Sequence, residues 1–93
     1  MISTVVATAR AQLQIAVIVD YLNERNPAAA RRFLEQLKTA HRQLSEFPLS
    51  GVRGRTTATR RLVVAPYVLT YRIVPAGVEV VDIRHSRQRD SAT

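Results

Sequence analysis

Apolar residues in the first part of the chain recur at the spacing of an α-helix. Steps of four, three and four residues separate Ala11, Ile15, Ile18 and Leu22. Such steps place side chains on one face of a helix. Thr8 is a suitable N-cap, because its hydroxyl can accept a hydrogen bond from an amide of the first turn. The pattern predicts a helix from about Ala9 to Arg25. Val17 and Val19 widen its apolar stripe, from which we expect contacts on more than one side.

A second helix is predicted to follow after a break of only two or three residues. Asn26 can cap it, and Pro27 suits its first position, where the missing N–H is not needed. Its predicted apolar face comprises Ala30, Phe33, Leu34, Leu37, Leu44 and Phe47. Pro48 ends the pattern, because a proline interrupts helical hydrogen bonding. Two helices joined by so short a break are expected to form an antiparallel hairpin.

The remaining segments show the pattern of β-strands. Residues 2–6 are rich in β-branched side chains and predict a first strand, whereas residues 48–59 (PLSGVRGRTTAT) predict a loop. Three more strands are predicted over 60–64, 67–73 and 78–85. The order β-α-α-β-β-β predicts one α+β domain over residues 1–93, in which a helical hairpin packs on one face of a small, mainly antiparallel sheet. The tail from about residue 86 is expected to be flexible.

Alternation assigns side chains to the two faces of this sheet. We expect the helices to cover the more apolar face, formed by Leu69, Tyr71, Ile73, Val81, Ile83 and His85. The other face is predicted to carry Arg61, Val63, Val68, Thr70, Arg72, Val80, Asp82 and Arg84. A surface that mixes valines with arginines is usually hidden against another molecule. The second face is therefore the candidate for binding a partner.

The net charge narrows the class of partner. Fourteen Lys and Arg against seven Asp and Glu give a charge of +7, and thirteen of the cations are arginine. Residues 48–93 hold eight cations and three anions, whereas residues 1–47 hold six and four. Arginine suits planar contacts with phosphate or carboxylate. A nucleic acid and an acidic protein would satisfy this surface equally well.

Composition excludes several kinds of chemistry. The absence of cysteine rules out disulfides, thiolate catalysis and cysteine-ligated zinc. The two histidines, His41 and His85, are isolated in the sequence and do not make a metal site, so we expect no metal and no cofactor. No apolar run approaches the roughly 20 residues that span a bilayer, and the N-terminus lacks the pattern of a signal peptide. We expect a cytoplasmic protein without membrane contact.

The segment RHSRQRD (84–90) poses a choice between catalysis and binding. It places His85 among Arg84, Arg87 and Arg89. Histidine titrates near neutral pH, but a general base needs its partners within hydrogen-bond reach. Because Arg84 and His85 are neighbours in a strand, their side chains point to opposite faces unless the strand has already ended. This favours a basic docking surface over a set of reacting groups.

Six features of the sequence occur together in the order of a known family. They are the spacing of the first helix, NPAAARRF (26–33), FPLSG (47–51), Arg61-Leu62, PYVLTYRI (66–73) and VEVVDIRH (78–85). Together they cover nearly all of the chain and resemble the RelE/ParE superfamily of toxins from bacterial toxin–antitoxin pairs. The resemblance implies a helical hairpin packed on an antiparallel sheet. It also implies a partner, a cognate antitoxin that wraps around the toxin and neutralises it.

The resemblance implies one of two activities. RelE-like members cleave messenger RNA on the ribosome without metal, using clustered Arg or Lys with a Glu, His or Tyr, whereas ParE-like members act on DNA gyrase. Here Val68 stands where the ribonuclease members tend to have an arginine, and no tyrosine follows His85. The ending IRHSRQRD is similar to the ParE-like terminus. We therefore expect a ParE-like growth inhibitor. The alternatives are a ribosome-dependent ribonuclease and a non-toxic binding module.

Two sets of site residues correspond to these alternatives. The residues predicted to bind the antitoxin or the target are Arg60, Arg61, Val68, Thr70, Arg72, Val80, Arg84, Arg87 and Arg89. If the protein is a ribonuclease, the resemblance implies that Arg61, Arg84 and His85 are catalytic. Two of these residues have a second interpretation: Arg72 can pair with Glu79 or Asp82 across a hairpin, and His85 can serve in packing or hydrogen bonding at the sheet edge.

Overall fold

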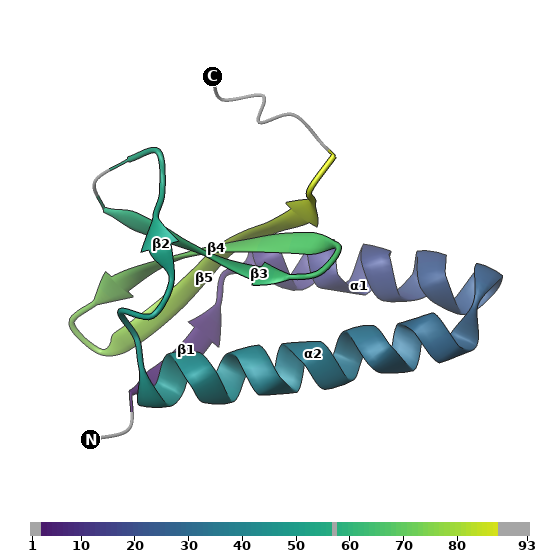
Figure 1. The fold of residues 1–93 in the computed structure, drawn as a ribbon, viewed down its shortest axis with the longest axis horizontal. Helices are drawn as coiled ribbons and strands as arrows, with labels where there is room; N and C mark the ends of the chain where they lie inside the picture. Colours follow the sequence, from purple (N-terminus) through teal and green to yellow (C-terminus); the bar gives the residue numbers. More distant parts are fainter. Residues whose placement is uncertain (1–2, 57, 88–93) are drawn as a thin grey trace.

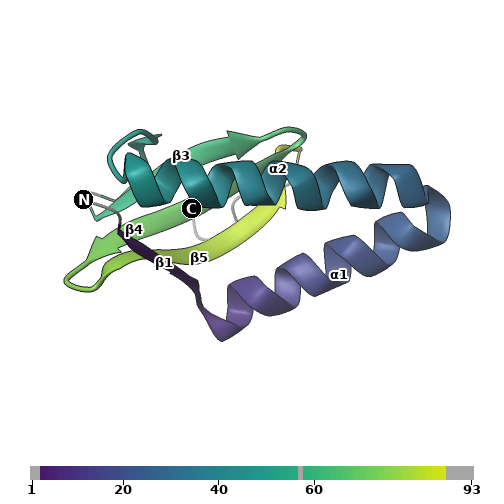
Figure 2. The ribbon, with the colours of Figure 1, turned by 90° about the horizontal axis from the view of Figure 1, so that it is seen from below.

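The computed structural model describes residues 3–56 and 58–87. Its elements in chain order are β1 (Thr4–Ala7), α1 (Ala9–Arg25), α2 (Pro27–Glu46), β2 (Val52–Arg53), β3 (Thr59–Val64), β4 (Tyr67–Val74) and β5 (Gly77–His85). The strands form one sheet in the order β1-β5-β4-β3-β2, in which β1 runs parallel to β5 and all other neighbours are antiparallel. Both helices lie on the same side of this sheet (Figures 1 and 2). The predicted architecture of a helical hairpin on a mainly antiparallel sheet is confirmed.

Strand β2 is the element that the sequence pattern missed. It lies inside the segment predicted as a loop, and it pairs Val52 with Arg61 and Arg53 with Arg60. Two residues are too few to show an alternation, so a strand this short leaves no signal in the sequence. The first strand also begins later than predicted, at Thr4.

The helix boundaries agree with the predicted ones because the capping residues act as expected. Thr8 Oγ1 accepts a hydrogen bond from the Ala11 amide at 3.1 Å, and Asn26 Oδ1 accepts one from the Ala29 amide at 3.2 Å. Asn26 caps the end of α1 and the start of α2 at once. Within the described residues, neither helix combines the length and the apolarity needed to cross a membrane.

The core lies between the helices and the face of the sheet that they cover. Its largest fully buried side chains are Tyr71, Leu44, Ile83 and Val78. Phe33 of α2 packs on Tyr67 with 5.0 Å between the ring centroids. Two residues predicted on the buried face of α2 are exposed, Leu34 at 42% and Phe47 at 63%. Phe47 is the C-cap, where the helix has ended, and Leu34 lies one position round the helix from Phe33, which takes the contact with the sheet.

A β-bulge in β5 changes which residues face the helices. The register pairs Thr70 with Asp82 but Tyr71 with Val80, so Val81 is an extra residue in the strand. Val80 consequently points into the core and is 6% exposed. The sequence prediction is wrong for Val80 and Val81, because an inserted residue reverses the alternation on its N-terminal side. The assignment holds again from Asp82 onward.

Candidate functional site

The sheet face turned away from the helices is the candidate binding surface, which we call the open face. Three rows of paired residues cross it: Thr59, Arg72 and Glu79; Arg61, Thr70 and Asp82; and Val63, Val68 and Arg84. Val52 extends the face at the β2 edge as the partner of Arg61, and Val6 extends it at the β1 edge. Val63 is 73% exposed and Val52 is 64% exposed. The open face thus exposes valines among charged side chains, as predicted.

Two of the three arginines on the open face are neutralised by carboxylates of the same face. Arg72 Nε donates to Glu79 Oε1 at 2.7 Å, which is the cross-strand pair given as its second interpretation. Arg84 forms an ion pair with Asp82 of its own strand, with 2.9 Å between Arg84 Nε and Asp82 Oδ2. Arg61 is exposed and forms no ion pair with any residue in 3–56 or 58–87. The open face is therefore less basic than the sequence indicated.

Asp82 connects the open face to α1. Gln14 Nε2 donates to Asp82 Oδ1 at 2.9 Å, and Arg10 approaches the same oxygen at 3.4 Å. Gln14 also accepts a hydrogen bond from the Ile83 amide at 3.0 Å. Burial raises the pKa of Asp82, but hydrogen bonds from Arg84 and Gln14 and the charges of both arginines outweigh it, so the pKa is lowered. The carboxylate is held ionised while it fastens α1 to the sheet.

The predicted binding residues are divided between several surfaces. Those on the open face are Arg61, Val68, Thr70, Arg72 and Arg84. Arg60 lies opposite Tyr71, on the side of the helices, and its guanidinium donates to the Gly51 carbonyl at 2.8 Å. Arg87 is exposed beyond the end of β5, and Arg89 lies outside the described residues. Val80 is in the core, for the reason given above.

Of the three residues named for the ribonuclease alternative, Arg84 and His85 line the same pocket beside α1, whereas Arg61 does not line it. Arg61 on β3 and Arg84 on β5 are separated by β4, which corresponds to about 10 Å at the usual strand spacing. His85 points to the opposite face from Arg84, and its ring packs edge-on against Tyr67 at 5.5 Å between centroids. His85 Nδ1 accepts a hydrogen bond from the Arg87 amide at 3.1 Å. These contacts fit the packing and hydrogen-bonding interpretation of His85.

The sequence pattern indicated only one member, Val17, of an exposed apolar stripe on α1. Leu13, Val17 and Tyr21 follow one another at steps of four and are 66%, 60% and 53% exposed. A pocket of about 380 Å³ separates this stripe from the end of the sheet, and its lining includes Leu13, Val17, Tyr67, Arg84 and His85. We call the stripe and this pocket the α1 groove. The members of this stripe have helical spacing, but so do Ala11, Ile15, Ile18 and Leu22. The spacing alone does not show which of the two faces is buried.

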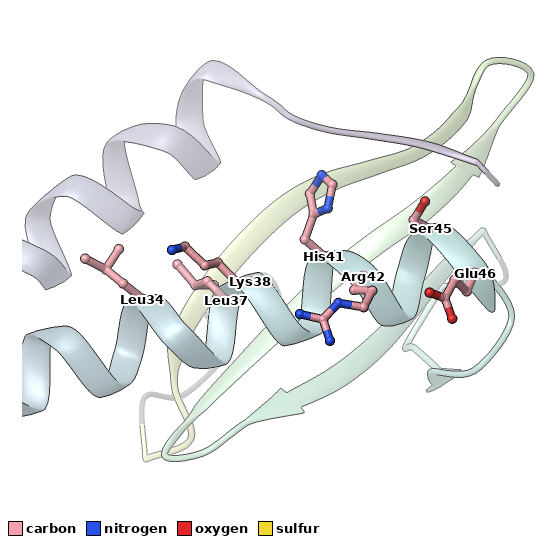
Figure 3. Close-up of a pocket in the computed structure, with 7 residues that line it drawn as sticks. All are labelled: Leu34, Leu37, Lys38, His41, Arg42, Ser45 and Glu46. Atoms are coloured by element: carbon pink, nitrogen blue, oxygen red, sulfur yellow. The ribbon is translucent and has the colours of Figure 1, made fainter.

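A further depression runs along α2 (Figure 3). Its lining side chains all come from this helix: Leu34, Leu37, Lys38, His41, Arg42, Ser45 and Glu46. His41 is exposed there, as expected for a residue on the helix surface. In the part of the chain that the structure describes, no group of three His, Cys, Asp or Glu gathers in a way that could hold a metal ion.

The fold and its open face define a class of protein, a small α+β domain in which the helices leave one sheet face uncovered. Residues 5–90 match the family described as ParE toxin of type II toxin-antitoxin system, parDE. The chain belongs to this family of toxins. Membership implies a cognate antitoxin as its partner.

Individual relatives agree with this assignment. The chain is 39% identical over 82 residues to "Toxin RelE2" of Caulobacter vibrioides, covering 88% of this chain and 93% of that protein. It is 38% identical over 84 residues to "Putative toxin Y4kP" of Sinorhizobium fredii, covering 88% and 86%. A solved structure described as "Chromosomal ParDE TA system from P. aeruginosa" superposes with a TM-score of 0.77 at 15% identity, covering 90% and 96% of the two chains. This last likeness supports the fold.

Proposed function

We propose that this protein is a ParE-like toxin that arrests growth by inhibiting DNA gyrase in the cytoplasm. The observation that carries this choice is the separation of Arg61 from Arg84 and His85. Cleavage of RNA without metal needs an acid, a base and cations gathered around one phosphate. Here Arg84 is bound to Asp82, and Arg61 is separated from Arg84 and His85 by strand β4. A toxin that acts by binding needs no such cluster.

The test is a supercoiling assay with purified gyrase and relaxed plasmid. The protein is expected to inhibit supercoiling, and its induced expression is expected to cause DNA breaks and growth arrest. With purified ribosomes it should leave messenger RNA intact. Cleavage of the message in codon register, with gyrase left active, would replace this proposal by the ribonuclease function.

The ribonuclease alternative is favoured by one observation, the 39% identity to a relative named Toxin RelE2. Its discriminating experiment is a comparison of variants in the ribosome assay. If the protein cleaves message, Arg61→Ala and His85→Ala should each reduce cleavage far more than Arg31→Ala, which removes an exposed arginine from α2.

For the antitoxin we propose a binding site formed by the α1 groove and the adjoining open face. The groove offers three exposed apolar side chains on one helix, and the open face offers valines beside Arg61, which has no ion pair among the described residues. A segment with apolar and acidic residues would match both surfaces and become ordered as it binds. Leu13→Glu/Val17→Glu should stay toxic but escape neutralisation by the co-expressed antitoxin, whereas Asp20→Asn on the same helix should be neutralised normally.

A further inference from the structure

The turn between α2 and β2 presents large apolar side chains to solvent. Phe47 is 63% exposed, and Leu49 and Val52 are each 64% exposed. We call Phe47 and Leu49 the apolar tip, and Val52 next to it belongs to the edge of the open face. Connecting segments are normally polar, and exposed apolar residues that occur together often mark a contact with another molecule.

Hydrogen bonds from side chains of β3 and β4 hold the backbone of this turn in place. The Tyr71 hydroxyl, on a side chain with no exposed surface, donates to the Pro48 carbonyl at 2.7 Å and accepts from the Gly51 amide at 2.9 Å. Arg60 donates to the Gly51 and Leu49 carbonyls at 2.8 and 3.3 Å. A Cβ on Gly51 would lie only 2.7 Å from the Tyr71 hydroxyl, so the close approach requires glycine. The core therefore holds in place a turn whose own apolar side chains point away from it.

Uncompensated positive charge flanks the apolar tip. The sequence between Glu46 and Glu79 contains five arginines and no acidic residue. Arg53 and Arg60 lie directly opposite each other on β2 and β3, and like charges so placed destabilise a sheet. Within residues 3–56 and 58–87, neither of them nor Arg55 forms an ion pair. This arrangement suits an anionic partner.

We propose that the apolar tip, flanked by Arg53 and Arg55, is the surface through which the toxin docks on its protein target. The matching site is an apolar depression bordered by acidic side chains. The phosphates of a nucleic acid could pair with the arginines, but its backbone offers no apolar surface to bury Phe47 and Leu49. Because the turn is already fixed, little conformational entropy is lost on docking. The inference rests on the proposed function, in which the toxin acts by binding another protein.

The position of the tip separates it from the proposed antitoxin site. The tip lies at the C-terminal end of α2, about 30 Å along that helix from the α1–α2 turn (Figure 1). It adjoins the start of β3, whereas the α1 groove reaches Tyr67, just past the end of β3. Phe47 and Leu49 precede β2 and lie outside both the α1 groove and the open face. Substitutions of these two residues should therefore affect toxicity without affecting neutralisation by the antitoxin.

The experiment compares the full-length protein with Phe47→Ser/Leu49→Ser in two measurements. Induced in cells, the variant is expected to lose growth arrest. Its capture by immobilised purified gyrase should fall by about 30-fold or more, the effect of losing a central binding residue. The unfolding midpoint should stay at the wild-type value because both side chains are exposed. Phe47→Leu/Leu49→Met, which keeps the tip apolar, should keep growth arrest, and so should Leu34→Ser, which removes an exposed leucine elsewhere on α2.

Three outcomes separate the possible failures. A tip variant that folds and arrests growth like the wild type overturns the inference. Loss of arrest in Arg53→Ser/Arg55→Ser but not in the tip variant would indicate a nucleic acid contact and would also overturn it. A wild-type protein that arrests growth while leaving gyrase active overturns the proposed function instead, and loss of arrest in the tip variant would then still support the tip as the contact with the target.

Discussion

The guanidinium of Arg84 holds both carboxylate oxygens of Asp82, Nε to Oδ2 and Nη2 to Oδ1, each at 2.9 Å. The two residues are two positions apart on β5, so their side chains share the open face. Strand β1 pairs with β5 only as far as Val80, and from there α1 takes its place through Gln14 and Arg10. The ion pair of Asp82 and Arg84 thus lies where the element beside β5 changes from β1 to α1.

Replacement of Asp82 by asparagine should lower the free energy of unfolding at pH 7 by about 1–3 kcal/mol, because it leaves the partly buried Arg84 without its counter-charge. Urea denaturation measures this. The matched control is Glu24→Gln, whose carboxylate is exposed and 3.9 Å from Arg25, and which should change the value by less than about 0.5 kcal/mol.

The same substitution should alter the dependence of stability on pH. The pKa of Asp82 is lower in the folded chain than in the unfolded one. Its contribution to stability is therefore present above the unfolded pKa of about 3.9 and is lost as the pH falls through the folded pKa. The difference in unfolding free energy between wild type and Asp82→Asn should shrink as the pH falls from 5 toward about 2. A difference that stays constant over this range would contradict the lowered pKa.

The bulge in β5 predicts opposite outcomes for two valines. Val80→Ala should lower the free energy of unfolding by about 1–3 kcal/mol, because it leaves a cavity in the core. Val63→Ala, on the open face, should change it by less than about 0.5 kcal/mol. Chemical denaturation of both variants decides the matter. Similar values for the two would mean that Val80 faces outward and that the regular alternation of the strand is intact.

Loss of the Tyr71 hydroxyl should loosen the apolar tip. Tyr71→Phe removes the acceptor of the Gly51 amide and the donor to the Pro48 carbonyl, which should cost about 1–3 kcal/mol for buried groups left without partners. Hydrogen exchange at the Gly51 amide should accelerate in the variant. Tyr21→Phe, at an exposed position on α1, should leave both measurements unchanged.

Gly77 is required where β1 meets the β4–β5 turn. Its φ is +142°, and a Cβ there would overlap the Thr4 carbonyl oxygen. Gly77→Ala should therefore lower the free energy of unfolding by about 2 kcal/mol or more, through backbone strain and displacement of β1. The neighbouring Ala76→Ser is the control and should be nearly neutral. Equal stability of the two variants in urea would show that β1 tolerates a side chain at this position.

The sequence was sufficient for those parts of the fold that depend on local chemistry. Thr8, Asn26 and Pro27 mark helix ends because capping acts within one turn, and the helix bounds follow from them. The bulge at Val81 could not be read, because one inserted valine in a run of apolar residues looks the same as a regular strand. Burial of Val80 depends on packing against the helices, which no local pattern records.

The candidate site was predicted less completely than the fold. The pattern placed Arg61, Arg72 and Arg84 on one face, and the structure agrees. It did not reveal that Arg84 is held by Asp82, since that pairing depends on side-chain geometry and on α1. The sequence pattern likewise did not predict the hydrogen bonds of Arg60 to the Leu49 and Gly51 carbonyls, because it is the pairing of β2 with β3 that brings this loop beside Arg60. Exposure of Leu13 and Val17 depends on which face of α1 packs against the sheet, and both faces carry apolar residues at helical spacing.

The parallel pairing of β1 with β5 bears on how the chain acquires its shape. Thr4 lies beside Gly77, so the N-terminal strand has no neighbour in the sheet until the last strand has been synthesised. Contacts between such distant segments form slowly. A nascent chain can therefore complete both helices while β1 still lacks its neighbour, and the sheet gains its parallel edge only after β5 has been made.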